Sequence, residues 1–168
     1  VLLGPVTGDV DLSSADAKLT GTNSSDLAGT MVAGVGDVNN DGFDDLTVGS
    51  SSNDDAATNA GIVYLFYGPV AGEISLDDAH VQFTGETSGA AARSALSTGG
   101  DVDGDGLGDL VMGAYGYEPT DSSNPGATYL FYGPLALTGT NALSSGDVVF
   151  VGDDGGYTGY AVAGGGDS

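Results

Sequence analysis

Short apolar runs alternate with polar turns along the whole chain. Two runs, at 62–67 and 127–132, are almost continuously apolar, which is typical of strands that are covered on both faces. The stretches at 51–60 and 115–126 are rich in Ser, Asn, Asp, Gly and Pro, so we expect variable surface loops there. The pattern favours a chain made almost entirely of strands and turns.

The pattern recurs with a period of about 64–67 residues, which indicates repeated structural units. Turns that end in Gly-Pro begin each period, at residues 3–5, 67–69 and 132–134. Four-stranded antiparallel units of this length are typical of propeller blades, each of which packs its sheet against the next. Strands are expected at 29–35, 45–50, 61–67, 80–84, 93–98, 109–114, 127–132 and 147–151. The two apolar strands should lie in the middle of their sheets.

The predicted fold is therefore all-β, with consecutive four-stranded antiparallel blades of an incomplete β-propeller. The repeat period sets the expected boundaries: residues 1–28 end a preceding blade, 29–92 and 93–158 form two blades, and 159–168 start a following blade. Neither an initiator Met nor a signal peptide precedes Val1, so we expect the chain to be a processed or excised piece.

Two acidic stretches, 37–45 and 101–109, place oxygen-bearing side chains at positions 1, 3, 5 and 9 around a glycine at position 6. Calcium takes about six to eight oxygen ligands at roughly 2.3–2.6 Å, so alternate side chains of a tight turn must point at one centre. Position 7 would add its backbone carbonyl, and Gly42 and Gly106 would allow the positive φ of the turn. The predicted ligands are Asp37, Asn39, Asp41, Phe43 and Asp45 in the first loop, Asp101, Asp103, Asp105, Leu107 and Asp109 in the second, and Asp167 as the first ligand of a third copy.

The calcium spacing differs from that of an EF-hand. An EF-hand needs a bidentate Glu at position 12 and flanking helices, but position 12 here is Val48 or Met112. Position 9 instead runs directly into an apolar run, at 46–48 or 110–112, so each loop should join two strands. An Asp- and Gly-rich solvated turn without an ion is the alternative, and the presence of two copies in register makes it the weaker one.

The composition limits the classes of partner. A net charge of −22 arises from 24 acidic residues against two basic ones, so ion pairs within the chain cannot relieve the repulsion, whereas bound cations can. Nucleic acid and anionic membranes both need basic patches, and insertion into a membrane needs about 20 consecutive apolar residues, which the chain lacks. There is no cysteine and hence no disulfide. Calcium loops of the weak kind would stay largely empty in the cytosol, so we expect an extracellular protein, secreted or at the cell surface.

Residues 34–49, followed by 61–68, resemble the FG-GAP repeat of integrin α-subunit β-propellers and their bacterial relatives, and 99–114 is a closer match. The resemblance covers essentially the whole chain. It implies propeller blades whose strand-to-strand loops bind calcium through the side chains named above and the carbonyl at position 7, and we expect a bacterial source. A propeller of this family has about seven blades, so the chain cannot close a ring alone.

The chain departs from the family at the element that gives the repeat its name. Ala28-Gly29, Ala92-Arg93 and Thr158-Gly159 stand where the family has Phe-Gly. Each missing aromatic removes about 1.5–3 kcal/mol of burial. We therefore expect packing between blades that differs from that of integrins.

The predicted function is a calcium-binding, calcium-stabilised module without catalytic residues, for adhesion, scaffold or matrix and fibre assembly. Its partners would be calcium ions (Ca2+) and protein, through self-assembly or through the remaining blades of a parent chain. The alternative is a non-catalytic part of a secreted hydrolase that carries FG-GAP repeats. His80 is the single histidine, and the acid pairs at 54–55, 77–78 and 153–154 could serve a glycosidase in principle, but adjacent acids in such loops are usually solvated.

Overall fold

The computed structural model describes residues 1–2, 4–5, 7–92, 95–119 and 124–165, and among them the chain is all-β, with three short 3₁₀ turns and no α-helix. None of these turns is long or apolar enough to span a membrane. The 3₁₀ turns are η1 (Leu12–Ser14), η2 (Leu76–Asp78) and η3 (Leu143–Ser145). The strands are β1 (Ala17–Thr20), β2 (Ala28–Gly36), β3 (Asp45–Ser50), β4 (Ile62–Phe66), β5 (Gly72–Ser75), β6 (Val81–Thr84), β7 (Ala95–Gly100), β8 (Asp109–Ala114), β9 (Ala127–Phe131), β10 (Gly139–Ala142) and β11 (Val148–Val151).

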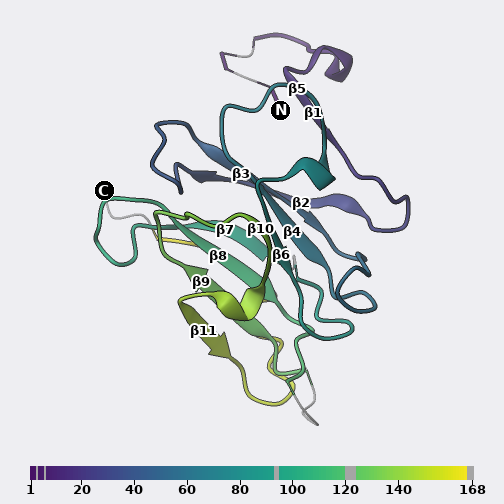
Figure 1. The fold of residues 1–168 in the computed structure, drawn as a ribbon, viewed down its shortest axis with the longest axis vertical. Coiled ribbons are helices and arrows are strands. Elements are labelled where there is room, and N and C mark those ends of the chain that lie inside the picture. The colour runs from purple at the N-terminus through teal and green to yellow at the C-terminus, as the bar shows by residue number, and fades with distance from the viewer. Residues whose placement is uncertain (3, 6, 93–94, 120–123, 166–168) are drawn as a thin grey trace.

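The strands form three sheets that follow one another along the long axis of the molecule (Figure 1). The central sheet has the order β10-β6-β4-β3-β2, and its strands β2, β3, β4 and β6 are antiparallel. The next sheet has the order β11-β9-β8-β7 and is antiparallel throughout. The prediction of an all-β fold built from four-stranded antiparallel units is confirmed. All five residues of β4 are buried, as expected for a strand covered on both faces.

Two short strands were missed by sequence reasoning. β5 pairs in parallel with β1, and β10 pairs in parallel with β6, each in a four-residue register that starts at a glycine. β10 thereby adds a fifth strand to the central sheet, while β1 and β5 make a small sheet of their own. Each of these segments pairs with a strand more than fifty residues earlier in the chain, so its strand conformation depends on a tertiary contact that the local sequence pattern does not show.

The main core lies between the central sheet and the sheet of β7, β8, β9 and β11. Phe83 of β6 and Phe131 of β9 meet there, with their ring centroids 4.8 Å apart. Phe150 is the third residue of β11, as Phe83 is of β6, but Phe83 is 0 % exposed and Phe150 is 54 % exposed. The following sheet packs on Phe83, whereas the described residues form no further sheet that could pack on Phe150. Burial of an outer strand is thus decided by the next blade.

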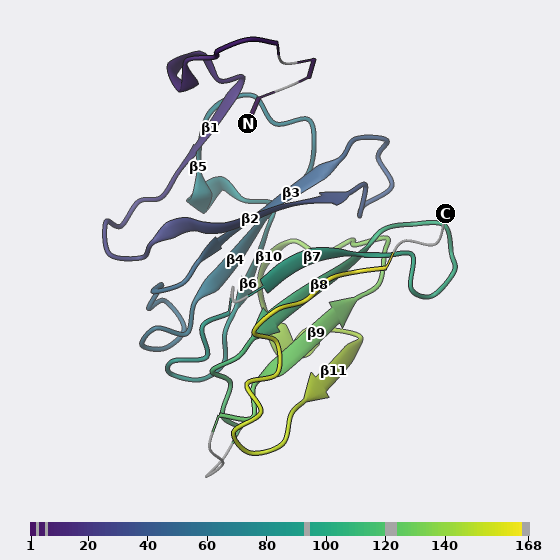
Figure 2. The same ribbon diagram turned by 180° about the vertical axis from the view of Figure 1, so that it is seen from behind.

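Small residues at the position of the missing aromatic bring the backbones close together. Ala92 is buried between Gly61 and Gly85, and a Cβ added to Gly85 would lie 3.1 Å from the Ala92 Cβ. Thr158 has the same place next to Gly126 and Gly152 in the following repeat. Residues 159–165 then run beside β7, where the Gly164 N–H donates to Ser97 Oγ at 3.2 Å (Figure 2).

The expectation of a surface loop at 51–60 is wrong for part of that segment. Asn53 is 2 % exposed and Ala60 is fully buried. The amide of Asn53 donates to carboxylate oxygens of Asp26 and Asp55, both at 3.1 Å, and its backbone carbonyl accepts the Gly61 N–H. The polar residues therefore satisfy one another inside the fold. In the second polar stretch, residues 120–123 lie outside the described residues.

Candidate metal centre

The two acidic loops occupy equivalent places in their sheets. Residues 37–45 lead from β2 into β3, and residues 101–109 lead from β7 into β8. A register shift precedes each loop, between Gly34 and Gly36 in one sheet and between Thr98 and Gly100 in the other. Such irregularities end strand pairing and re-aim the chain, so both loops start from the same distorted strand end.

The carboxylate at position 1 closes each loop onto its own backbone. In the first loop, Asp37 accepts the N–H groups of Asp41 at 3.0 Å and Gly42 at 2.8 Å. In the second loop, Asp101 accepts those of Gly104 and Gly106, both at 2.8 Å. The carboxylate oxygens of Asp37 and Asp101 thus point into their loops although the neighbouring acids repel them, because backbone N–H groups donate to these oxygens.

Positions 3 and 5 repeat this arrangement one step along the chain. Asn39 Oδ1 and Asp103 Oδ1 each accept the N–H of the residue at position 5, at 3.1 Å in both loops. Asp41 Oδ1 accepts the Phe43 N–H at 2.9 Å, and Asp105 Oδ1 accepts the Leu107 N–H at 2.8 Å. The two loops therefore have the same hydrogen-bond pattern at these positions.

The acid at position 9 has a second role that the spacing did not reveal. Asp45 accepts the Val38 N–H at 3.0 Å with one oxygen and the Gly68 N–H at 2.8 Å with the other. Asp109 does the same with Val102 at 2.6 Å and Gly133 at 2.9 Å, and it is 0 % exposed. Each of these acids ties its loop to the Gly-Pro turn that follows the third strand of the blade.

Burial raises the pKa of Asp45 above its ordinary value. The N–H groups of Gly68 and Val38 act in the opposite direction, and the neighbouring charges of Asp41 and Asp37 raise the pKa further. A cation beside this carboxylate would favour its charged form.

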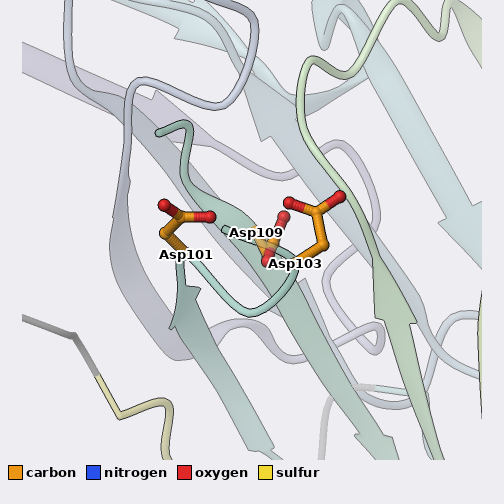
Figure 3. Close-up of side chains that lie close together, drawn as sticks. All are labelled: Asp101, Asp103 and Asp109. Carbon is orange, nitrogen blue, oxygen red and sulfur yellow. The ribbon is translucent and has the colours of Figure 1, made fainter. Parts of the chain in front are cut away.

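Three carboxylates of the second loop converge. Asp101, Asp103 and Asp109 each offer an oxygen, and these oxygens all lie within 4.8 Å of one another (Figure 3). Asp105 is not part of this group. A carboxylate has about four lone-pair sites, so the oxygens that accept one N–H retain capacity for a cation. Oxygen ligands of this kind suit a hard divalent cation such as calcium or magnesium, so the residues fit such an ion.

Two further outcomes concern the loop backbone. Gly42 and Gly106 both have φ of +90°, the conformation for which the sequence predicts glycine. Position 4 is also left-handed, with φ of +62° at Asn40 and +81° at Gly104, and sequence reasoning missed it. Its signal is present, because Asn and Gly are the residues that adopt this conformation most readily. Asp167, the predicted first ligand of a third copy, lies outside the described residues.

His80, directly before β6, has a structural contact with the end of β4. Its Nδ1 accepts the Tyr67 N–H at 3.0 Å, and its ring lies against Tyr67 with centroids 5.1 Å apart. Asp147 accepts the Tyr132 N–H at 2.9 Å in the equivalent place of the next repeat. The exposed acid pairs at 54–55, 77–78 and 153–154 lie in separate loops and turns.

Comparison with known proteins places these loops in a family context. The FG-GAP repeat matches residues 30–66 and 92–131. Integrin alpha-5 of Xenopus laevis is 33 % identical over 115 residues, which cover 67 % of this chain and 11 % of the relative. Integrin alpha-IIb of Mus musculus is 31 % identical over 109 residues, covering 65 % and 10 %, and integrin alpha-PS2 of Drosophila melanogaster is 33 % identical over 99 residues, covering 56 % and 7 %.

These shares mean that the chain spans about a tenth of the length of the curated relatives it matches. All three relatives come from animals, so the expectation of a bacterial source has no support from them.

Proposed function

Because the chain is an integrin α-like FG-GAP repeat protein with β-propeller blades, we propose that it is a non-enzymatic, extracellular adhesion module whose two hairpin loops bind calcium. The convergence of Asp101, Asp103 and Asp109 carries the proposal. The first loop supports it, because Asp37, like Asp101, accepts the N–H at position 6, and Asp45 makes the same two backbone bonds as Asp109.

The ion would be held by Asp37, Asn39, Asp41 and Asp45 in one loop and by Asp101, Asp103, Asp105 and Asp109 in the other, with the carbonyls of Phe43 and Leu107 as further ligands. Bound calcium supplies positive charge where carboxylates crowd. Within the described part of the chain the one ion pair joins Lys18 and Glu73 at 3.4 Å, with both side chains exposed, so it contributes little against a net charge of −22.

Protein partners are proposed to cover the outer faces of the blades. Val32 of β2, in the central sheet, is 63 % exposed, and Phe150 of β11, in the sheet of β7, β8, β9 and β11, is 54 % exposed. Each of these two strands has an equivalent strand in the other repeat, or a neighbouring strand in its own sheet, that packs against another sheet. Remaining blades of a propeller or another copy of the chain would bury these apolar side chains.

The test is calorimetric titration of the chain with calcium, combined with thermal unfolding in chelator and in millimolar calcium. We expect uptake of two ions and a higher midpoint of unfolding with calcium. Asp101→Asn should remove one of the two binding events, whereas Asp154→Asn, which changes the same charge at an exposed site outside the loops, should leave both. Absence of calcium uptake by the unsubstituted chain would refute the calcium part of the proposal.

The hydrolase alternative stays a prediction. His80 is engaged with the Tyr67 N–H, and the acid pairs lie in separate segments, so no observation favours a catalytic site over the adhesion module.

A further inference from the structure

Among the side-chain ligand positions 1, 3, 5 and 9, the two loops differ only at position 3, which is Asn39 in the first loop and Asp103 in the second. The total charge of the loops is nevertheless the same, because the first has an additional acid at position 8, Asp44, where the second has Gly108. The number of charges therefore does not distinguish the two loops as cation sites, whereas the placement of their carboxylates does.

The placement favours the second loop. Asp103 brings a third carboxylate oxygen within 4.8 Å of those of Asp101 and Asp109. The residue that replaces it in the first loop offers a neutral amide oxygen. Asp44 is exposed at position 8, and among the described residues no group of three acids in the first loop comes within the same distance.

The amide of Asn39 also introduces a donor. Its Nδ2 donates to Asp41 Oδ2 at 2.9 Å, so an oxygen of the position-5 acid is already engaged by a side chain. A carboxylate at position 3 has no such donor, and its charge stays available to a cation. The first loop is therefore satisfied internally to a greater degree, and a cation there must compete with the Asn39–Asp41 bond.

We propose that the two loops are unequal cation sites that fill in order, with loop 101–109 binding calcium before loop 37–45, and that the pair Asn39 and Asp103 sets this order. The inference rests on the proposed function, because it assumes that both loops take calcium. The charge and rigidity of the ligand set tune calcium affinity in oxygen-ligand loops over several orders of magnitude, and we expect one additional carboxylate ligand to lower the dissociation constant about tenfold.

The experiment follows each loop separately by nuclear magnetic resonance of the full chain during a calcium titration. The amides of Gly42 and Gly106 are suitable reporters, because each donates to the position-1 carboxylate of its own loop at 2.8 Å. We expect the Gly106 signal to reach its bound position at about tenfold lower calcium than the Gly42 signal. Simultaneous movement, or earlier movement of Gly42, overturns the inference while leaving calcium binding intact. If neither signal moves, the proposed function fails as well, so the two failures are distinguishable.

Reciprocal variants test the cause of the order. Asn39→Asp should shift the Gly42 transition about tenfold toward lower calcium, and Asp103→Asn should shift the Gly106 transition about tenfold toward higher calcium. Asp44→Asn is the matched control, since it removes one charge from the first loop at position 8 and should shift the Gly42 transition by less than about twofold. Equal effects of Asp44→Asn and Asp103→Asn on their own loops would show that charge number, and not placement, decides the affinity, and would overturn the inference. Dispersed spectra in chelator confirm that each variant is folded.

Discussion

Replacing Asp109 by Ala should destabilise the protein even when no calcium is present. Both oxygens of this fully buried acid accept backbone N–H groups, from Val102 at 2.6 Å and Gly133 at 2.9 Å. A hydrogen bond to a charged group contributes about 1.5–3 kcal/mol. Loss of both gives about 3–6 kcal/mol, and relief of the cost of burying the charge brings the expected loss toward the lower end, about 3 kcal/mol.

The matched control is Asp105→Ala in the same loop. Asp105 is exposed to solvent, and its carboxylate accepts the N–H of Leu107 at 2.8 Å. Removal of this exposed hydrogen bond by Asp105→Ala should lower the free energy of unfolding in chelator by less than about 1 kcal/mol. In millimolar calcium, both variants should lose the stabilisation that the second loop gains from its ion. The comparison separates a structural tie at position 9 from a ligand at position 5.

The assay is urea unfolding in chelator, with the free energy extrapolated to water. Small domains are stable by about 5–15 kcal/mol, so a loss of about 3 kcal/mol is measurable. If Asp109→Ala fails to fold, Asp109→Asn provides the measurement, because its amide oxygen keeps one of the two acceptors and its loss should be about half as large. A loss below about 1 kcal/mol for Asp109→Ala in chelator would refute the structural tie.

Three other outcomes follow from the structure. In urea unfolding, Phe83→Ala should lower the free energy of unfolding by about 3–5 kcal/mol and Phe150→Ala by less than about 1 kcal/mol, because Phe83 is buried and Phe150 is 54 % exposed. Equal losses would contradict the burial of Phe83 by the next blade. Gly106→Ala should lower the free energy of unfolding by about 1–2 kcal/mol because of its φ of +90°. Gly34→Ala is the control and should be nearly neutral in the same measurement, because an added Cβ has open space at both glycines and Gly34 does not have a positive φ. Burial raises the pKa of Tyr64 to about 12, so the stability that the neutral phenol contributes is complete below its unfolded pKa near 10 and is lost as the pH rises through 12. Tyr64→Phe should therefore reduce the fall in the free energy of unfolding over this pH range by about 2–3 kcal/mol. A pH profile of unfolding that is the same in the variant would contradict the raised pKa.

Local patterns in the sequence predicted the elements that depend on local chemistry. The expected strands at 45–50 and 109–114 coincide with β3 and β8, because an apolar run bounded by polar turns specifies a strand without reference to the rest of the chain. The spacing of acids around Gly42 and Gly106 likewise specified the tight turns, since the positive φ at those glycines is a property of the loop itself. The repeat period then indicated that these elements belong to equivalent blades.

The tertiary structure alone decided which surfaces are buried and which acids hold the blades together. Phe83 and Phe150 have the same place in their strands, yet a following sheet covers Phe83, whereas none of the described residues forms a further sheet over Phe150. Asp45 and Asp109 were expected as calcium ligands, and the structure adds their bonds to Gly68 and Gly133, which lie about one strand pair away in the chain. The physical reason is that periodicity and spacing act over a few residues, whereas burial and these backbone ties depend on segments that are brought together only when the sheets form.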